Sequence, residues 1–473
     1  MRRAVILTLL LALAGSASAQ LGRVPANPEA DSLFARALQA FEAEEYADAA
    51  AEFSRVAAAF PLHANTTAAA FMHARALYRV GAWERAGGAF ESFIREYPTS
   101  RYVTEAERMR GLAMSAQLAM ARRPVTLGIV LSLDPQESSA SQSLFNGIRL
   151  AIDAHNGRPD NRQVEMVFRD LHTMNADAAV ADLVNAGAAL IVGALFSDQA
   201  QAVGAAAERY MVPFVAPLAT DPEVSQGLAW AFQANPTITA RGRLMARFAV
   251  NGLRLRELGV IAEDDELGIS EEMGRAFAEE AEAMGASVRF IEVLPNSQAW
   301  FRLGNHVEAD SLRNVRAVYA PLSGAGADRL AGGFLAELDD MLGTGTPGDI
   351  SGLRVLGNAA WHDLPFLEQA SRYVVTYSND FHFEPEGDQA QAFTRRHRTL
   401  TGQAPDRLAV VGYDLSRLLV DRMMAGDAEQ VRAALLSGGD YQGLGIRVHF
   451  AGDQVNRTMF YHRYRNGVLE LMR

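Results

Sequence analysis

A short stretch in the middle of the chain brings polar loops and free backbone amides together in a way that suits an anion. Residues 189–220 show an apolar strand (Ala189–Val192), a polar turn, a helical segment and a second apolar strand (Val212–Val215). In such a unit the loop after each strand lies at the carboxyl edge of a parallel sheet, where the first amides of a helix have no partner. The loops Leu195–Gln199 and Pro217–Asp221 are therefore predicted to receive an anionic group of a ligand.

Patterns that carry catalysis or hold metals do not occur in the sequence. The ten histidines form no HExxH pair or other zinc spacing, and no GxSxG motif is present. The acidic run 263–266 lacks the alternating spacing of a calcium loop, and we interpret it as a solvated rim. The chain has no cysteine, which excludes disulfides and thiolate metal sites. We interpret the protein as a binder and not an enzyme, with no cofactor or metal.

The elements that must position these loops follow a regular order after residue 124. Proline at 124 ends a long helical pattern, and strand and helix patterns then alternate. The alternation restarts near residue 259, which predicts two parallel-sheet α/β lobes with a ligand cleft between them. The expected strands are 125–131, 164–168, 189–192 and 212–215 in the first series, then 259–262, 288–293, 317–320 and 355–356 in the second.

An all-helical domain is predicted at residues 29–122, where the sequence is rich in alanine and repeats itself. Small, aromatic and proline positions recur 37 residues apart, as Pro61 and Pro98 do. The repeat unit resembles the tetratricopeptide repeat, a pair of packed helices. Such a domain serves either as a docking groove for a peptide or protein, or as a spacer or dimerisation element. The matched pairs are Ala37/Ala74, Phe41/Tyr78, Tyr46/Trp83, Phe53/Phe90, Phe60/Tyr97 and Pro61/Pro98.

The N-terminus predicts export. Residues 1–19 combine Arg2 and Arg3, an apolar core and a small-residue end, which is typical of a secretory signal peptide, followed by a linker at 20–28. The alternative, a membrane anchor, needs an apolar span of about 20 residues. The formal net charge of −12 argues against nucleic acid or an anionic membrane as partner. Without a cysteine to lipidate, the expected location is the periplasm, with no direct insertion into a membrane.

Beyond these patterns, the sequence from about Val125 to Met472 resembles type 1 periplasmic binding proteins of the leucine/isoleucine/valine-binding branch. The resemblance rests on the order of VTLGIVLSL, FNGIRLAIDAHN, IVGALFS, VPFVAPLATDPEVS, FQANPT, GVIAEDDELG, AVYA, LGNAAW and VVGYDLSRLL. It implies two lobes that close on a small ligand by a hinge motion. The implied first lobe is 124–236 with 379–445, and the second is 239–376 with 447–473. The three crossovers are implied near 235–239, 376–380 and 445–449.

The resemblance also implies ligand contacts in the first lobe. Ser197 matches a serine that binds the ligand carboxylate, and Ala219 and Thr220 match a pair that contacts the ligand backbone. A hydroxyl and free helix amides suit a carboxylate. The alternative role of Ser197 is a helix N-cap. Other residues implied to line the same pocket are Leu195, Phe196, Leu218 and Ser139, the last within the loop 134–141.

The second lobe departs from the family pattern. Leu267-Gly268 stands where amino-acid binders usually have an aromatic residue before glycine, and Gly357–Trp361 lacks the usual glutamate partner of the ligand ammonium. An ammonium group buried without a carboxylate is strongly disfavoured. Asp363 and Asp134 are candidate substitutes. Tyr319, Asn358 and Trp361 are candidate ligand contacts here, and the two aromatic residues fit the core equally well.

Two functions follow from these predictions. The first is an exported solute-binding protein that captures a small polar ligand, an amino acid or related carboxylate, for a membrane transporter permease or for sensing. The second is a non-catalytic envelope regulator that acts by protein contact, because penicillin-binding-protein activators share this domain order. Those activators are lipoproteins, and this chain has no cysteine to lipidate.

Overall fold

The computed structural model describes residues 27–324, 326–343 and 352–472. The chain divides into two compact units, residues 1–123 and residues 124–473, which we describe separately. The predicted signal peptide and residues 20–26 of the predicted linker lie outside the described residues. Across the described ranges, no helix combines the length and the apolar character that crossing a bilayer requires.

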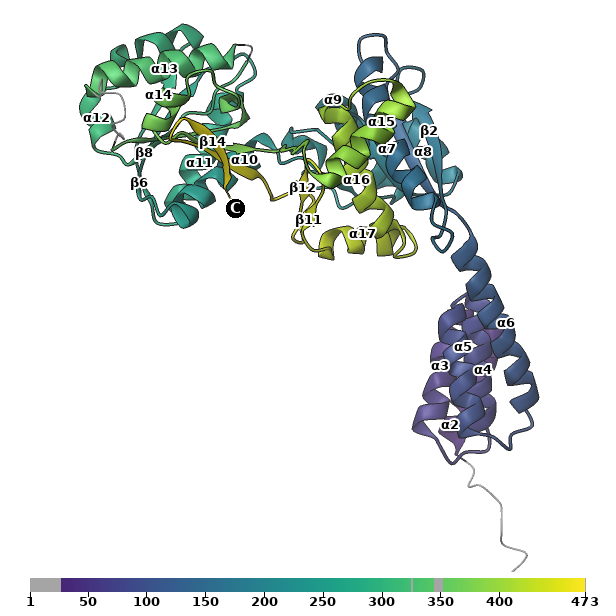
Figure 1. Ribbon diagram of the computed structural model, residues 1–473. Helices are drawn as coiled ribbons and strands as arrows, with labels where there is room; N and C mark the ends of the chain where they lie inside the picture. Colours follow the sequence, from purple (N-terminus) through teal and green to yellow (C-terminus); the bar gives the residue numbers. More distant parts are fainter. Residues whose placement is uncertain (1–26, 325, 344–351, 473) are drawn as a thin grey trace, which may run out of the picture. The chain divides into compact units, whose positions relative to one another are not determined.

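The first unit is helical throughout its described residues, as predicted (Figure 1). Its first helix begins at Pro28, where the side chain of Asn27 accepts hydrogen bonds from the amides of Glu29 and Ala30 and so caps the helix. The helices are α2 (Pro28–Glu42), α3 (Tyr46–Ala59), α4 (Thr66–Val80), α5 (Trp83–Glu96) and α6 (Val103–Arg122).

The 37-residue repeat explains how these helices pack. Ala37 and its repeat partner Ala74 are fully buried, and so are Phe53 and Phe90. The small residues let neighbouring helices approach, and the aromatic residues fill the space between them. The repeat therefore encodes one continuous core through α2–α6.

The first lobe is built on a five-stranded parallel sheet with strand order β2-β1-β3-β4-β5. Helix α7 packs closely against α16, and each helix has a glycine at the contact. A Cβ atom on Gly147 would lie 2.0 Å from the carbonyl oxygen of Ala409, and one on Gly412 would lie 2.2 Å from that of Leu144. The strands are β1 (Val125–Leu131), β2 (Val164–Asp170), β3 (Ala188–Gly193), β4 (Phe214–Ala216) and β5 (Ala231–Gln233). The helices are α7 (Ser138–Asn156), α8 (Ala176–Asn185), α9 (Ser197–Tyr210), α15 (Asp388–Thr401), α16 (Arg407–Met423) and α17 (Ala428–Ser437).

The second lobe is built on a seven-stranded sheet with strand order β14-β13-β10-β9-β8-β6-β7. The pairs from β10 to β7 are parallel, whereas β13 runs antiparallel to both β10 and β14. Two parallel-sheet lobes are thus confirmed, with a C-terminal hairpin added at one edge. The strands are β6 (Glu257–Glu263), β7 (Ser287–Leu294), β8 (Ala317–Tyr319), β9 (Arg354–Gly357), β10 (Thr376–Asn379), β13 (Phe460–Arg465) and β14 (Val468–Met472). The helices are α10 (Ile238–Arg247), α11 (Ile269–Ala283), α12 (Ala309–Arg313), α13 (Ala327–Leu342) and α14 (Leu367–Arg372).

The chain passes between the lobes three times, and the third passage differs from the one implied by the resemblance. The segment 445–449 was expected to cross, but Ile446, Val448 and Phe450 are buried in the core of the first lobe. There the short strands β11 (Tyr441–Gln442) and β12 (Arg447–Val448) pair with each other. The chain enters the second lobe only after Asn456, because alternating apolar residues hold the preceding segment to the first lobe.

Candidate ligand-binding site

Ser197 joins the two predicted ligand loops of the first lobe. It is the first residue of α9, and the N-cap position belongs to Phe196, whose side chain caps nothing. The hydroxyl oxygen of Ser197 accepts hydrogen bonds from the backbone amides of Thr220 and Asp221, each at 3.3 Å. The serine thus connects the loop after β3 to the loop after β4, and it is not the helix N-cap considered from the sequence.

This arrangement leaves several donors free at the start of α9. The Ser197 oxygen acts as acceptor in both of its hydrogen bonds, so its proton remains available to donate. The amides of Ser197, Asp198 and Gln199 make no hydrogen bond to any other described residue. Together with the positive end of the helix dipole, these donors suit a carboxylate.

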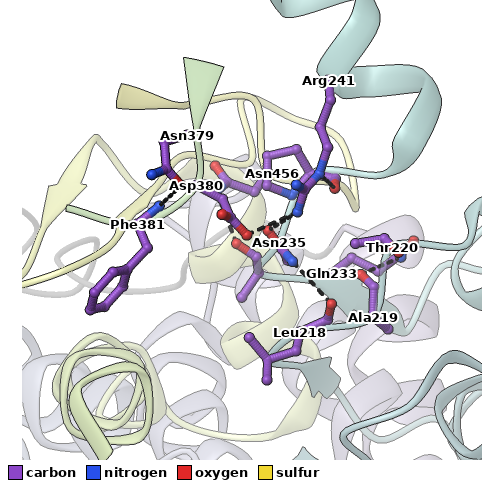
Figure 2. Close-up of polar contacts among 12 residues, drawn as sticks. Leu218, Ala219, Thr220, Gln233, Asn235, Arg241, Asn379, Asp380, Phe381 and Asn456 are labelled. Atoms are coloured by element: carbon purple, nitrogen blue, oxygen red, sulfur yellow. Dashed lines mark hydrogen bonds and ion pairs between the residues drawn. The ribbon is translucent and has the colours of Figure 1, made fainter. Parts of the chain in front are cut away.

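The loop after β4 accepts hydrogen bonds from the end of β5 and from the first crossover (Figure 2). The carbonyl oxygen of Leu218 accepts from the side-chain amide of Asn235 at 3.0 Å, and that of Ala219 accepts from the side-chain amide of Gln233 at 3.1 Å. The carbonyl oxygen of Thr220 accepts from the amide of Ile238, the first residue of α10 in the second lobe, at 3.0 Å. The loop and the first crossover therefore form one hydrogen-bonded piece.

The loop after β1 also reaches the start of α9, because the Gln199 side-chain amide donates to the Glu137 carboxylate at 2.8 Å. Ser139 lies exposed in the first turn of α7. Asp134, a candidate ammonium partner, lies 3.3 Å from the His172 ring and accepts from the amide of Gln136. The structure thus brings the first-lobe loops together and shows Asp134 engaged within them.

Apolar side chains beside these loops differ in exposure. Leu195 is buried, and Leu218 is partly buried against the first-lobe core. Phe196, in contrast, is 46% exposed beside the free start of α9. An exposed aromatic ring at that position offers a ligand an apolar surface next to the amide donors.

In the second lobe, Asn358 and Trp361 form hydrogen bonds inside the lobe, and Tyr319 packs in its core with a hydroxyl that has no hydrogen-bond partner among the described residues. The Tyr319 ring is fully buried and stacks on Phe277 with 4.4 Å between ring centroids. The Trp361 side chain is also fully buried, and its indole nitrogen donates to the carbonyl oxygen of Ala320 at 2.8 Å. Asn358 donates to the carbonyl oxygen of Leu322 at 2.7 Å and accepts from its amide at 3.2 Å.

The acidic run 263–266, which begins at the last residue of β6, was expected to be a solvated rim, but one of its carboxyl groups is buried. Glu263 is only 6% exposed, and it accepts a hydrogen bond of 2.7 Å from the indole nitrogen of Trp300. Burial raises the pKa of Glu263, although the Trp300 hydrogen bond opposes that change. Asp265 accepts from three backbone amides of the following turn. A carboxyl group is therefore buried at the carboxyl end of β6, which the run of acidic residues did not reveal.

A buried ion pair network connects the lobes at the second crossover (Figure 2). One carboxylate oxygen of Asp380 lies 2.9 Å from the Arg241 guanidinium of α10 and 2.7 Å from the Arg407 guanidinium of α16. The Asp380 side chain is 6% exposed. Its burial opposes ionisation, but the two guanidinium groups outweigh that effect and hold the pKa of Asp380 below its ordinary value. Asp380 thus ties a second-lobe helix to a first-lobe helix.

Asn456 makes the corresponding connection between the first and third crossovers. Its side-chain amide donates to the carbonyl oxygens of Ala234 at 2.9 Å and Arg447 at 2.8 Å. Its side-chain oxygen accepts from the amides of His449 and Thr458. Sequence reasoning assigned no role to Asp380 or Asn456, and the available signal was only that Asp380 ends the expected second crossover.

With this geometry, the comparison with known families is decisive. A family model described as periplasmic binding protein matches residues 124–467. The chain belongs to the periplasmic binding protein family. Family members of this kind are typically non-catalytic binding proteins, in agreement with the absence of catalytic patterns in the sequence.

Solved structures of similar fold agree with this membership. A putative branched-chain amino acid ABC transporter protein from Rhodospirillum rubrum is 21% identical, with a TM-score of 0.59 over 74% of this chain and 100% of that one. A branched-chain amino acid transporter protein from Rhodopseudomonas palustris is 15% identical, with a TM-score of 0.55 over 74% of this chain and 96% of that one. A substrate-binding protein from Desulfitobacterium hafniense in complex with leucine is 18% identical, with a TM-score of 0.51 over 74% of this chain and 100% of that one. At these identities the likeness establishes the fold.

A second family model, described as outer membrane lipoprotein, matches residues 26–149. This match covers the helical unit and continues into β1 and α7 of the periplasmic binding domain. It agrees with the predicted repeat-like helical domain. No curated protein matches the chain significantly.

Proposed function

We propose that this periplasmic binding protein is exported and captures a small carboxylate, an amino acid or a related acid, between its lobes. The observation that carries the proposal is the free start of α9, with the Ser197 hydroxyl proton and three amides directed to no described residue. The similarity to transporter substrate-binding proteins supports this role. In this proposal Ser197, Ala219, Thr220, Leu195, Phe196, Leu218 and Ser139 form the ligand site of the first lobe.

The hinge contacts support closure over such a ligand. The loop 218–220 is bonded directly to the first crossover, and Asp380 ties α10 to α16 beside it. A ligand held by this loop is therefore coupled to the segments that must rotate when the lobes close. Delivery to a membrane permease in the periplasm, or sensing, would then depend on the closed state.

The ligand class is tested by thermal unfolding of the chain from Gln20 against amino acids, small carboxylates, sugars and nucleosides. Binding to the folded state raises the midpoint in proportion to the logarithm of ligand concentration over affinity. We expect a rise with carboxylates, and loss of that rise in the Ser197→Ala/Thr220→Ala variant. A matched control is Ser143→Ala on α7, whose hydroxyl bonds Asp406 away from the loops.

Two results would contradict the proposal. One is a folded, ligand-free preparation that shows no shift with any compound. The other is a shift with a carboxylate that the double variant retains in full.

The second candidate function is an envelope regulator that acts by protein contact. The observation that favours it is the match of residues 26–149 to the lipoprotein family, together with the internal engagement of Tyr319, Asn358 and Trp361. Complementation of a deletion strain separates the two functions. A solute-binding role predicts that Ser197→Ala/Thr220→Ala fails to restore the phenotype, whereas a regulator predicts full restoration.

A further inference from the structure

A groove of about 1450 Å³ lies on the first lobe and is lined by residues of α7, α15 and α16. Helix α7 contacts both α16 and α15 (Figure 1). None of its lining residues belongs to the ligand loops or to the three crossovers. Its volume exceeds the roughly 300–1,000 Å³ of most small-molecule sites. The groove therefore needs an explanation separate from the proposed solute site.

Two helices each contribute a row of residues on one helix face to the lining of this groove. From α16 the lining residues include Tyr413, Arg417 and Val420, continued by Met424 directly after the helix, and a similar stripe comes from α15. Spacings of three and four residues place such positions on one helix face. Three helices that leave a channel of this kind have room for a fourth, as in a helix bundle.

The size of the groove agrees with a short helix. The α16 stripe from Tyr413 to Met424 extends over about 16 Å at 1.5 Å per residue. A helix of that length, with a diameter of 10–12 Å, fills about 1,300–1,800 Å³. The groove volume of about 1450 Å³ is of the same order, so the groove is large enough for such a helix.

The charged residues that line the groove indicate that such a helix would be acidic. Arg158, Arg395, Arg396 and Arg417 line the groove, and none of them forms an ion pair with a carboxylate in the described part of the chain. The two acidic lining residues each have a partner on their own helix, since Asp153 pairs with Arg149 and Asp421 with Arg422. In a chain of net charge −12, this cluster of unpaired arginines is a local reversal of sign.

The floor of the groove is apolar. Leu400, Tyr413 and Leu444 line it and are partly exposed. They pack above Leu150 and Phe393, which are 8% and 2% exposed. An apolar floor with arginines at its rim matches an amphipathic helix, with apolar side chains facing inward and carboxylates at its flanks. A bare phosphate or a flat lipid surface would leave that floor uncovered.

We propose that this groove binds a short acidic amphipathic helix of a partner protein, which completes a four-helix arrangement with α7, α15 and α16. Arg158 and Arg417 hold the carboxylates on one side, and Arg395 and Arg396 hold those on the other. The interaction takes place on the first lobe and does not depend on the solute that the lobes capture.

The test uses the full mature chain and fluorescent 12-residue peptides that are chemically stapled, because unstapled helices of this length are marginal in water. The peptides share a leucine stripe and carry four, two or no glutamates at the flanks, with glutamine as the replacement. We expect affinity to rise with the number of glutamates in fluorescence anisotropy. We expect Arg395→Glu/Arg396→Glu to weaken the four-glutamate peptide at least tenfold.

Two further variants separate the groove from general attraction between charges. Arg398→Glu lies on the same helix, exposed and outside the groove, and is expected to leave the affinity unchanged within twofold. Ala392→Trp fills the groove without a change of charge and is expected to abolish binding. Circular dichroism and the thermal midpoint confirm that each variant is folded.

Several outcomes would overturn the proposal. They are no binding of any peptide, equal binding of the glutamine peptide, or equal losses for Arg398→Glu and the double variant. Arginine-dependent binding of inorganic pyrophosphate or of phosphatidylglycerol vesicles, without peptide binding, would assign the groove to a different ligand.

Discussion

The two lobes share a fold but treat the polar groups at their sheet edges differently. In the first lobe, the loops after β3 and β4 leave a hydroxyl proton and three amides without partners in the described residues. In the second lobe, Asn358 and Trp361 use their polar groups on the neighbouring backbone. The first-lobe loops thus keep free donors, whereas Asn358 and Trp361 are held by the second-lobe backbone. The buried hydroxyl of Tyr319 is an exception in the second lobe, because it has no hydrogen-bond partner among the described residues.

The largest effect is expected from Trp361→Ala, which tests whether that residue belongs to the second-lobe core. The variant removes a fully buried ring that packs edge-on to Phe334, with 6.0 Å between ring centroids. We expect a loss of about 3–5 kcal/mol in the free energy of unfolding, measured by chemical denaturation. Trp361→Phe is the matched control, with a smaller loss and an unchanged ligand affinity. A reduced affinity in the folded Phe variant would place Trp361 in the ligand site.

The next effect concerns the contact between the lobes. Asp380→Ala leaves two guanidinium groups without their shared carboxylate. We expect the free energy of unfolding to fall by about 2–3 kcal/mol. This is less than for a fully buried pair, because Arg407 is half exposed. Asp421→Ala, which removes an exposed carboxylate, is the control with a loss below about 1 kcal/mol.

The same carboxylate predicts a dependence on pH. Its pKa in the folded protein is lowered, so its contribution to stability is present above the pKa of the unfolded chain. That contribution is lost as the pH falls through the folded pKa. Denaturation curves should therefore show the difference between the wild type and Asp380→Ala decreasing toward acid. A difference that stays constant from neutral to acid pH would contradict the charge-based explanation.

Ser197→Ala tests whether the first-lobe serine binds a ligand or only connects the two loops. The variant removes one acceptor for the Thr220 and Asp221 amides, which costs about 1–2 kcal/mol of stability. The affinity for a carboxylate ligand should fall about tenfold or more, measured by calorimetry once a ligand is known. If stability falls but affinity does not, the serine only connects the two loops.

The smallest effect is expected at Glu263, the buried carboxyl group at the end of β6. Because its pKa is raised in the folded state, its contribution favours folding at low pH and is lost as the pH rises through the folded pKa. Glu263→Gln keeps an acceptor for Trp300 and removes this titration. We expect the free energy of unfolding of the variant to equal or exceed that of the wild type at neutral pH, and this advantage to disappear in acid. A variant that is less stable at every pH would contradict this expectation.

Periodicity was sufficient to predict the helical domain, the two parallel sheets and the loops that follow β3 and β4. The third crossover was misplaced because the alternation of Ile446, Val448 and Phe450 is the same whichever lobe receives these residues. The ion pairs of Asp380 join residues 139 and 27 positions apart, and local patterns contain no information on such distant partners. Trp361 and Tyr319 were left open between core and ligand site, because burial depends on the packing of the whole lobe.

The strand order also determines when each lobe is complete during synthesis. All five strands of the first sheet lie in one continuous stretch, from Val125 to Gln233, so this sheet can assemble while the rest of the chain is still emerging. The second sheet needs β13 and β14, which end at Met472. Until the last residues arrive, β10 has a bare edge that is open to wrong pairing and to proteases. A chain that ends before β13 would therefore have a complete first sheet and an incomplete second sheet.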